Sequence, residues 1–69
     1  MEYDGYVRRE LARELRNRYP LGYVIGIRDL HRDLGCPRLV EPEFLAKLLV
    51  GFGLAKWASE DKTKVIILA

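Results

Sequence analysis

The chain has 69 residues, of which 49% are hydrophobic and 32% charged, and its 12 basic and 10 acidic residues leave a formal net charge of +2. So short a chain has room for one domain with one small core, which excludes two-lobed enzymes, Rossmann domains and TIM barrels. Its apolar content is too high for a disordered tail. We therefore expect residues 1–69 to form a single domain, whose weak positive charge permits a nucleic-acid partner without requiring one.

The choice of polar residues is unusual. Arginine outnumbers lysine by eight to four, and the chain has a single Asn and no Gln. Arginine suits phosphate and carboxylate recognition, and it suits ion-pair networks equally well. Many charges combined with few amides are typical of heat-adapted proteins, so we expect a thermophilic source.

Residues that carry catalytic or metal chemistry are scarce. Cys36 is the only cysteine and His31 the only histidine, which excludes an internal disulfide and a Cys-pair zinc site. Because no nucleophilic triad, metal-ligand cluster or phosphate-binding loop is recognisable, we expect no enzymatic activity, no metal and no cofactor. No apolar stretch approaches the roughly 20 residues that span a bilayer, and the chain begins without a leader pattern, so we expect a cytoplasmic protein without membrane contact.

The first predicted helix follows Asp4, which can cap a helix that begins near Gly5 or Tyr6. We expect its end at Tyr19, because Pro20 disfavours helix in the residue before it. One side of this helix is apolar, with the helical spacing of Val7, Leu11, Ala12, Leu15 and Tyr19.

The other side of the first helix is charged. Glu10 with Arg13, and Glu14 with Arg18, have the spacing of helical ion pairs. A basic stripe is formed by Arg9, Arg13 and Arg16. This stripe could lie along a phosphate backbone, contact a partner subunit or be a solvated face.

The rest of the chain predicts short elements. Residues 21–25 indicate a brief strand or an extended connection, and residues 27–34 a second helix, after which Gly35 suits a left-handed position. Pro42 is expected to begin a third helix. Its predicted apolar face comprises Phe44, Leu45, Leu48, Leu49 and Phe52, and its predicted outward face comprises Glu43, Ala46, Lys47 and Val50. Residues 54–58 and 63–68 are predicted to be the strands of a β-hairpin with a polar turn between them.

This order of elements resembles the winged helix-turn-helix family. The resemblance is carried by residues 28–35 (RDLHRDLG), residues 45–49 followed by Gly53-Leu54, and a wing over residues 56–68. It implies an α+β fold, a small winged helix with a three-helix core and a C-terminal β-hairpin wing. It also implies that the third helix enters the major groove of double-stranded DNA.

We therefore expect a DNA-binding protein of transcriptional regulation, acting as a homodimer because one copy with a charge of +2 attracts phosphates only weakly. Near the third helix the expected contacts are Arg38 and Lys47, with Ala46 and Val50 able to touch a thymine methyl group. The expected phosphate contacts elsewhere are Arg28, Arg32, Lys56, Lys62 and Lys64.

The alternative is a winged-helix module that binds another protein through the third helix and not DNA. An apolar group expected to face outward supports it, namely Leu39, Val40, Ala46 and Val50. Trp57 could stack on a base or pack as core under the wing. His31 is expected to be a partly buried structural residue, and Cys36 a small turn residue without a redox role.

Overall fold

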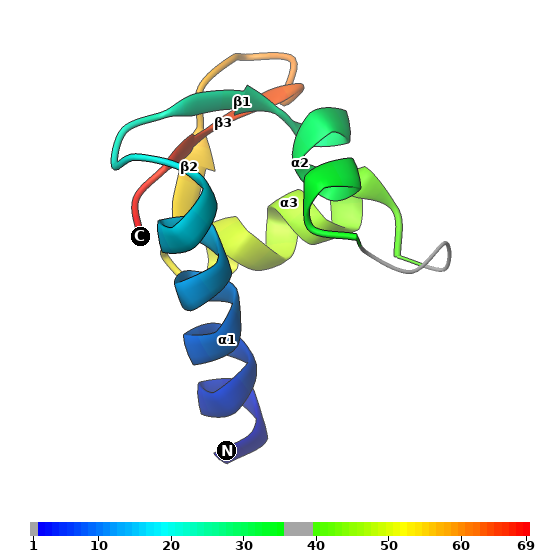
Figure 1. Cartoon of the computed structure of the whole chain (residues 1–69). Helices are drawn as coiled ribbons and strands as arrows, with labels where there is room; N and C mark the ends of the chain where they lie inside the picture. The colour runs from blue at the N-terminus through cyan, green and yellow to red at the C-terminus, as the bar shows by residue number, and fades with distance from the viewer. Residues whose placement is uncertain (1, 36–39) are drawn as a thin grey trace.

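The computed structural model of the chain describes residues 2–35 and 40–69, the side chains from Gly5 onward. Its elements in chain order are α1 (Glu2–Arg18), β1 (Val24–Gly26), α2 (Ile27–Asp33), α3 (Pro42–Gly51), β2 (Ala55–Trp57) and β3 (Lys64–Ile67) (Figure 1). The described part of the chain is therefore α+β, as the sequence predicts. The predicted β-hairpin is confirmed in β2 and β3.

The three strands form one antiparallel sheet in the order β1-β3-β2. β1 is a strand and not merely an extended connection, because Ile25 pairs with Val65 of the hairpin. On the other side of β3, Val65 is opposite Trp57 of β2. The short segment before α2 is thereby fixed to the far end of the chain.

The helices lie on one side of this sheet, below it in Figure 1, and the core fills the space between. Since neighbouring strand residues point to opposite faces, Val65 and Ile67 of β3 turn toward the helices and are completely buried. Every layer contributes to the core, whose buried members are Ala12, Leu15, Ile25, Ile27, Leu30, Leu45, Ala46, Leu49, Leu54, Ala55, Val65 and Ile67.

The predicted start of the first helix is wrong. α1 begins at Glu2, so Asp4 lies inside the helix and does not precede it. A first helical turn tolerates acidic residues because the helix dipole favours negative charge there. Gly5 is also tolerated, since its position in the helix is open to solvent. The N-terminal half of α1 extends away from the other elements (Figure 1).

The C-terminal half of α1 is attached to the body by apolar and polar contacts. Ala12 and Leu15 are buried, and Leu11 packs against the same core. Directly after α1, the Tyr19 hydroxyl donates a 2.7 Å hydrogen bond to Asp33 at the end of α2. Partial burial and this carboxylate both raise the pKa of Tyr19 above its ordinary value.

The charged side of α1 has the predicted ion pairs. Arg13 lies 2.8 Å from Glu10, and Arg18 lies 3.2 Å from Glu14. Arg8 makes a contact of longer range, because its Nε donates to the backbone carbonyl of Phe52, 3.1 Å away, at the end of α3. A cation is favourable at a helix C-terminus, so this contact joins α1 to α3.

The predicted orientation of α3 is partly wrong. Pro42 is its first residue, and Leu45 and Leu49 are buried as expected. However, Ala46 is 0% exposed instead of facing outward, and Phe44, expected in the core, is 60% exposed. Apolar residues continue on both flanks of the Leu45–Leu49 line, so helical periodicity cannot select the buried flank. Packing against α2 and β2 selects the side with Ala46.

This rotation reduces the apolar patch that we expected to face outward at α3. Ala46 is fully buried, while Val40 and Val50 are half-buried against the core. Leu39 lies outside the described residues. Of the described members of the predicted protein-binding patch, Ala46 is therefore inaccessible and Val40 and Val50 are only partly exposed.

Candidate nucleic-acid interface

The exposed face of α3 carries mixed chemistry. Its exposed residues are Glu43, Phe44, Lys47 and Gly51. Lys47, expected there from the sequence, is confirmed as exposed. Ala46 is buried and cannot make the expected contact with a thymine methyl, and Val50 is half-buried against the core. Phe44 is an exposed residue of this face that the sequence prediction placed in the core. The one pattern that could have indicated its exposure is its position one helical turn before Leu48, on the less buried flank of the helix.

The two arginines predicted on α2 differ in their surroundings. Both Arg28 and Arg32 are exposed. The Arg32 guanidinium lies 3.2 Å from Asp29 and 3.8 Å from Asp33, which neutralise it in part. Arg28 lines a shallow cleft of about 330 Å³ at which the first residues of α2, α3 and β3 meet. The charged residues lining the cleft are Arg28, Asp29, Glu43 and Lys64, so its charge is balanced.

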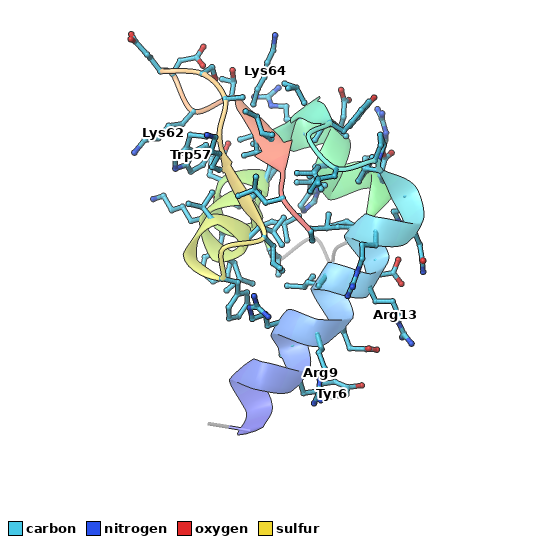
Figure 2. All side chains as sticks on the ribbon, turned by 90° about the vertical axis from the view of Figure 1, so that its left-hand side faces the viewer. Tyr6, Arg9, Arg13, Trp57, Lys62 and Lys64 are labelled. Atoms are coloured by element: carbon cyan, nitrogen blue, oxygen red, sulfur yellow. The ribbon has the colours of Figure 1, made fainter. Side chains whose placement is uncertain are left out.

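The loop of the hairpin brings Lys62 and Trp57 together. The Lys62 ammonium lies 5.7 Å from the centroid of the Trp57 ring, the geometry of a cation–π contact (Figure 2). Lys62 adopts a left-handed backbone with φ of 59°. Trp57 is half-buried and packs against the core, so its core interpretation is confirmed while one part of the ring remains accessible.

A hydrogen-bond network holds this loop in shape. Asp61 accepts 2.7 Å hydrogen bonds from the hydroxyls of Ser59 and Thr63 and a 3.2 Å bond from the Thr63 backbone N–H. These donors favour the ionised carboxylate and lower the pKa of Asp61. The loop that positions Lys62 is therefore stabilised by a negative charge in its own turn.

The order of the loop is expected to depend on pH. Folding lowers the pKa of Asp61. The ionised carboxylate therefore stabilises the loop fully above the ordinary carboxyl pKa near 4, and this stabilisation is lost as the pH falls through the lowered pKa. Fluorescence of Trp57, the only tryptophan, should therefore change below about pH 4 before helical circular dichroism is lost. Asp61→Asn should show the acid-like emission already at pH 7. Glu60→Gln, in the same exposed loop, is the matched control, and an equal effect there would contradict this role of Asp61.

The remaining lysines do not lie with Lys62. Lys56 and Lys64 are exposed and project from the sheet face that the helices do not cover. In Figure 2, Lys62 lies beside Trp57 while Lys64 extends elsewhere, at the top of the view. Arg38 lies outside the described residues. The described residues that were predicted to contact DNA are thus divided among α3, α2, the hairpin loop and the outer side of the sheet.

The basic stripe of α1 lies apart from the hairpin. Arg9, Arg13 and Arg16 are all exposed, and Arg13 is paired with Glu10. Figure 2 shows Tyr6, Arg9 and Arg13 at the opposite end of the molecule from Trp57 and Lys62. The stripe therefore does not form one surface with Trp57 and Lys62.

His31 has a structural position. It is half-buried, and its Nε2 donates to the backbone carbonyl of Val40, which joins α2 to the residues before α3. Among the side chains of residues 5–35 and 40–69, no group of three or more His, Cys, Asp and Glu could hold a metal ion.

Comparison of the chain with protein-family models, with curated proteins and with solved structures finds no match. Within the described ranges, no helix has both the length and the apolar character needed to cross a membrane.

Proposed function

We propose that the chain is a winged-helix domain that binds double-stranded DNA and acts in transcriptional regulation. The element order α1-β1-α2-α3-β2-β3 and the sheet order β1-β3-β2 support it. The observation that carries the proposal is the placement of Lys47 and Lys62. Lys47 lies on the exposed face of α3, and α3 packs against β2, the strand that leads into the loop of Lys62.

In the proposed complex α3 lies in the major groove, and its four exposed residues face the base pairs. Lys47 would donate to guanine or to a phosphate, Glu43 would accept from a cytosine amino group, and Phe44 would contact a thymine methyl. Lys62 and Arg28 would contact phosphates on the flanks and set the position of the helix. Two copies on adjacent half-sites would double these contacts and compensate for the net charge of +2.

A titration of the protein with a labelled duplex at several salt concentrations tests this function. Affinity should fall steeply as salt rises, because bound lysines and arginines release counterions from DNA. Lys62→Glu should weaken binding to all sequences and reduce the salt slope by about one or more. Lys47→Glu should weaken binding by about tenfold or more and reduce discrimination between sequences.

Lys56→Glu is the matched control, because it makes the same charge change on the opposite side of the sheet. It should alter affinity by less than about threefold, through the long-range field alone. Absent binding at low salt, an affinity that does not vary with salt, or an equal loss in Lys56→Glu would each contradict the proposal.

The second candidate function is a winged-helix module that binds a protein through α3. It is favoured by Phe44, an aromatic side chain 60% exposed on this face, because such residues often anchor protein interfaces. A pull-down from source extract with wild type and Phe44→Ala distinguishes the two functions. A stoichiometric protein lost in Phe44→Ala favours the module, whereas recovery of nucleic acid alone contradicts it.

A further inference from the structure

The sheet has one face that no helix covers. Figure 1 shows the helices on the other side, and strand alternation determines which side chains project from the bare side. Leu68 continues the β3 ladder, because its N–H donates to the carbonyl of Leu54, 2.8 Å away. We call this surface the outer sheet face, and its members are Val24, Lys56, Lys64, Ile66 and Leu68.

The centre of the outer sheet face is apolar. Ile66 is half-buried and is directly opposite Val24 on β1, and Leu68 follows it on the same face of β3. Val24 is 49% exposed and Leu68 is 42% exposed. Single exposed apolar residues are ordinary on protein surfaces, but neighbouring ones on one face of a sheet form an apolar patch, a feature typical of interaction sites.

The charged residues of the outer sheet face are both cations. Lys56, on β2, is directly opposite Ile66 of β3, and Lys64 precedes Ile66 by two residues on β3 itself. Within the described residues, no ion pair shorter than 4 Å includes either lysine, although Asp29 and Glu43 line the same cleft as Lys64. The apolar centre is therefore bordered by Lys56 on the β2 side and by Lys64 at one end, where Asp29 and Glu43 also lie in the neighbouring cleft.

We infer that the outer sheet face binds an acidic amphipathic helix of a partner protein. The apolar side of such a helix would cover Val24, Ile66 and Leu68, and its carboxylates would reach Lys56 and Lys64. From Lys64 to Leu68 the face extends about 13 Å, since a strand rises about 3.3 Å per residue. That length matches between two and three helical turns of 5.4 Å. β1 and β2 have three residues each, too few for a partner strand to gain much by pairing with a sheet edge.

The charges of the outer sheet face argue against the other occupants. A second copy docked face to face would bring Lys56 and Lys64 of both copies together, and like charges at an interface are costly. A DNA duplex would satisfy the lysines but would leave Val24, Ile66 and Leu68 without an apolar surface against them. The inference does not rest on the proposed DNA binding, which uses the exposed face of α3, the hairpin loop and Arg28, the last of which lies in the same cleft as Lys64.

A designed peptide tests the inference directly. The probe is a 15-residue helical peptide with leucine along one side and glutamate along the other, titrated into isotopically labelled full-length protein. We expect binding in the micromolar to submillimolar range that weakens with salt, with amide shifts concentrated at residues 24, 56, 64, 66 and 68. A peptide with lysine in place of glutamate should not bind.

Variants separate this surface from the DNA interface. Lys56→Glu/Lys64→Glu should weaken the acidic peptide by about tenfold or more while the protein stays folded, because both changes are at exposed positions. Val24→Thr, which keeps a β-branched side chain, should weaken it by about threefold. Lys62→Glu should leave peptide binding unchanged even though it weakens DNA binding.

Three outcomes would overturn the inference. The first is the lack of peptide binding at 1 mM peptide, since a dissociation constant of about 1 mM is already weaker than the expected range. The second is a set of amide shifts on α1 or α3 in place of the sheet. The third is displacement of the peptide by a DNA duplex or by dimerisation of the chain, which would assign the outer sheet face to nucleic acid or to a second copy.

Discussion

Leu15→Ala is expected to destabilise the protein by about 3 kcal/mol and to lower the melting temperature by roughly 10–20 °C. Leu15 is 0% exposed and is a member of the core, where it joins the C-terminal half of α1 to the other elements. Truncation removes its buried methyl groups and leaves a cavity that the surrounding side chains fill incompletely. A 69-residue domain has a total stability of only about 3–10 kcal/mol, so the loss is a large part of the whole.

Urea denaturation followed by circular dichroism and by Trp57 fluorescence measures this change. Leu21→Ala is the matched control, because it removes the same atoms from a side chain that is 75% exposed. It should change the free energy of unfolding by less than about 0.5 kcal/mol. Equal effects of the two variants would mean that α1 is not held to the body by Leu15.

Ala46→Leu is expected to destabilise the protein by about 1–3 kcal/mol or to shift α3. Ala46 is completely buried in α3, and a larger side chain there must displace its neighbours in a core that is already close-packed. If Ala46 faced outward, as we expected from the sequence, leucine would be nearly neutral because both residues favour helix. Thermal unfolding of the variant therefore distinguishes the observed rotation of α3 from the predicted one.

Lys47→Leu introduces the same residue at the next position of the helix and is the control for this experiment. Lys47 is exposed, so leucine there should alter stability by less than about 0.5 kcal/mol. Lys47 is exposed in the predicted orientation as well, so stability that is unchanged in both variants would mean that α3 is rotated toward its predicted face.

The orientation of α3 shows where sequence reasoning stops. Leu45 and Leu49 define a buried line that periodicity locates correctly. On one side of this line lies Phe44, on the other Ala46, and hydrophobicity alone favours burial of the larger residue. The structure buries the smaller one, because the space left between α3 and its neighbours, and not the preference of a single residue, decides which flank fits.

The candidate interface was predictable only residue by residue. Lys47 and Lys62 are exposed as expected, and the loop that holds Lys62 could be recognised as a polar turn. Which of the predicted contact residues lie close together was not predictable, because the distances between them depend on how the elements pack. Strand alternation alone could have placed Lys64, Ile66 and Leu68 on one face, and this was the available signal for the outer sheet face.

Local interactions explain why the sequence sufficed for the elements themselves. The spacing of apolar residues, Pro42 at the start of a helix, and Gly35 with its φ of 64° act within a few neighbouring residues, so their consequences can be read along the chain. Contacts between distant segments decided the pairing of β1 with β3, the buried flank of α3 and the separation of Lys56 and Lys64 from Lys62. Their energies depend on shape and volume in three dimensions, which a linear pattern of residue types does not contain.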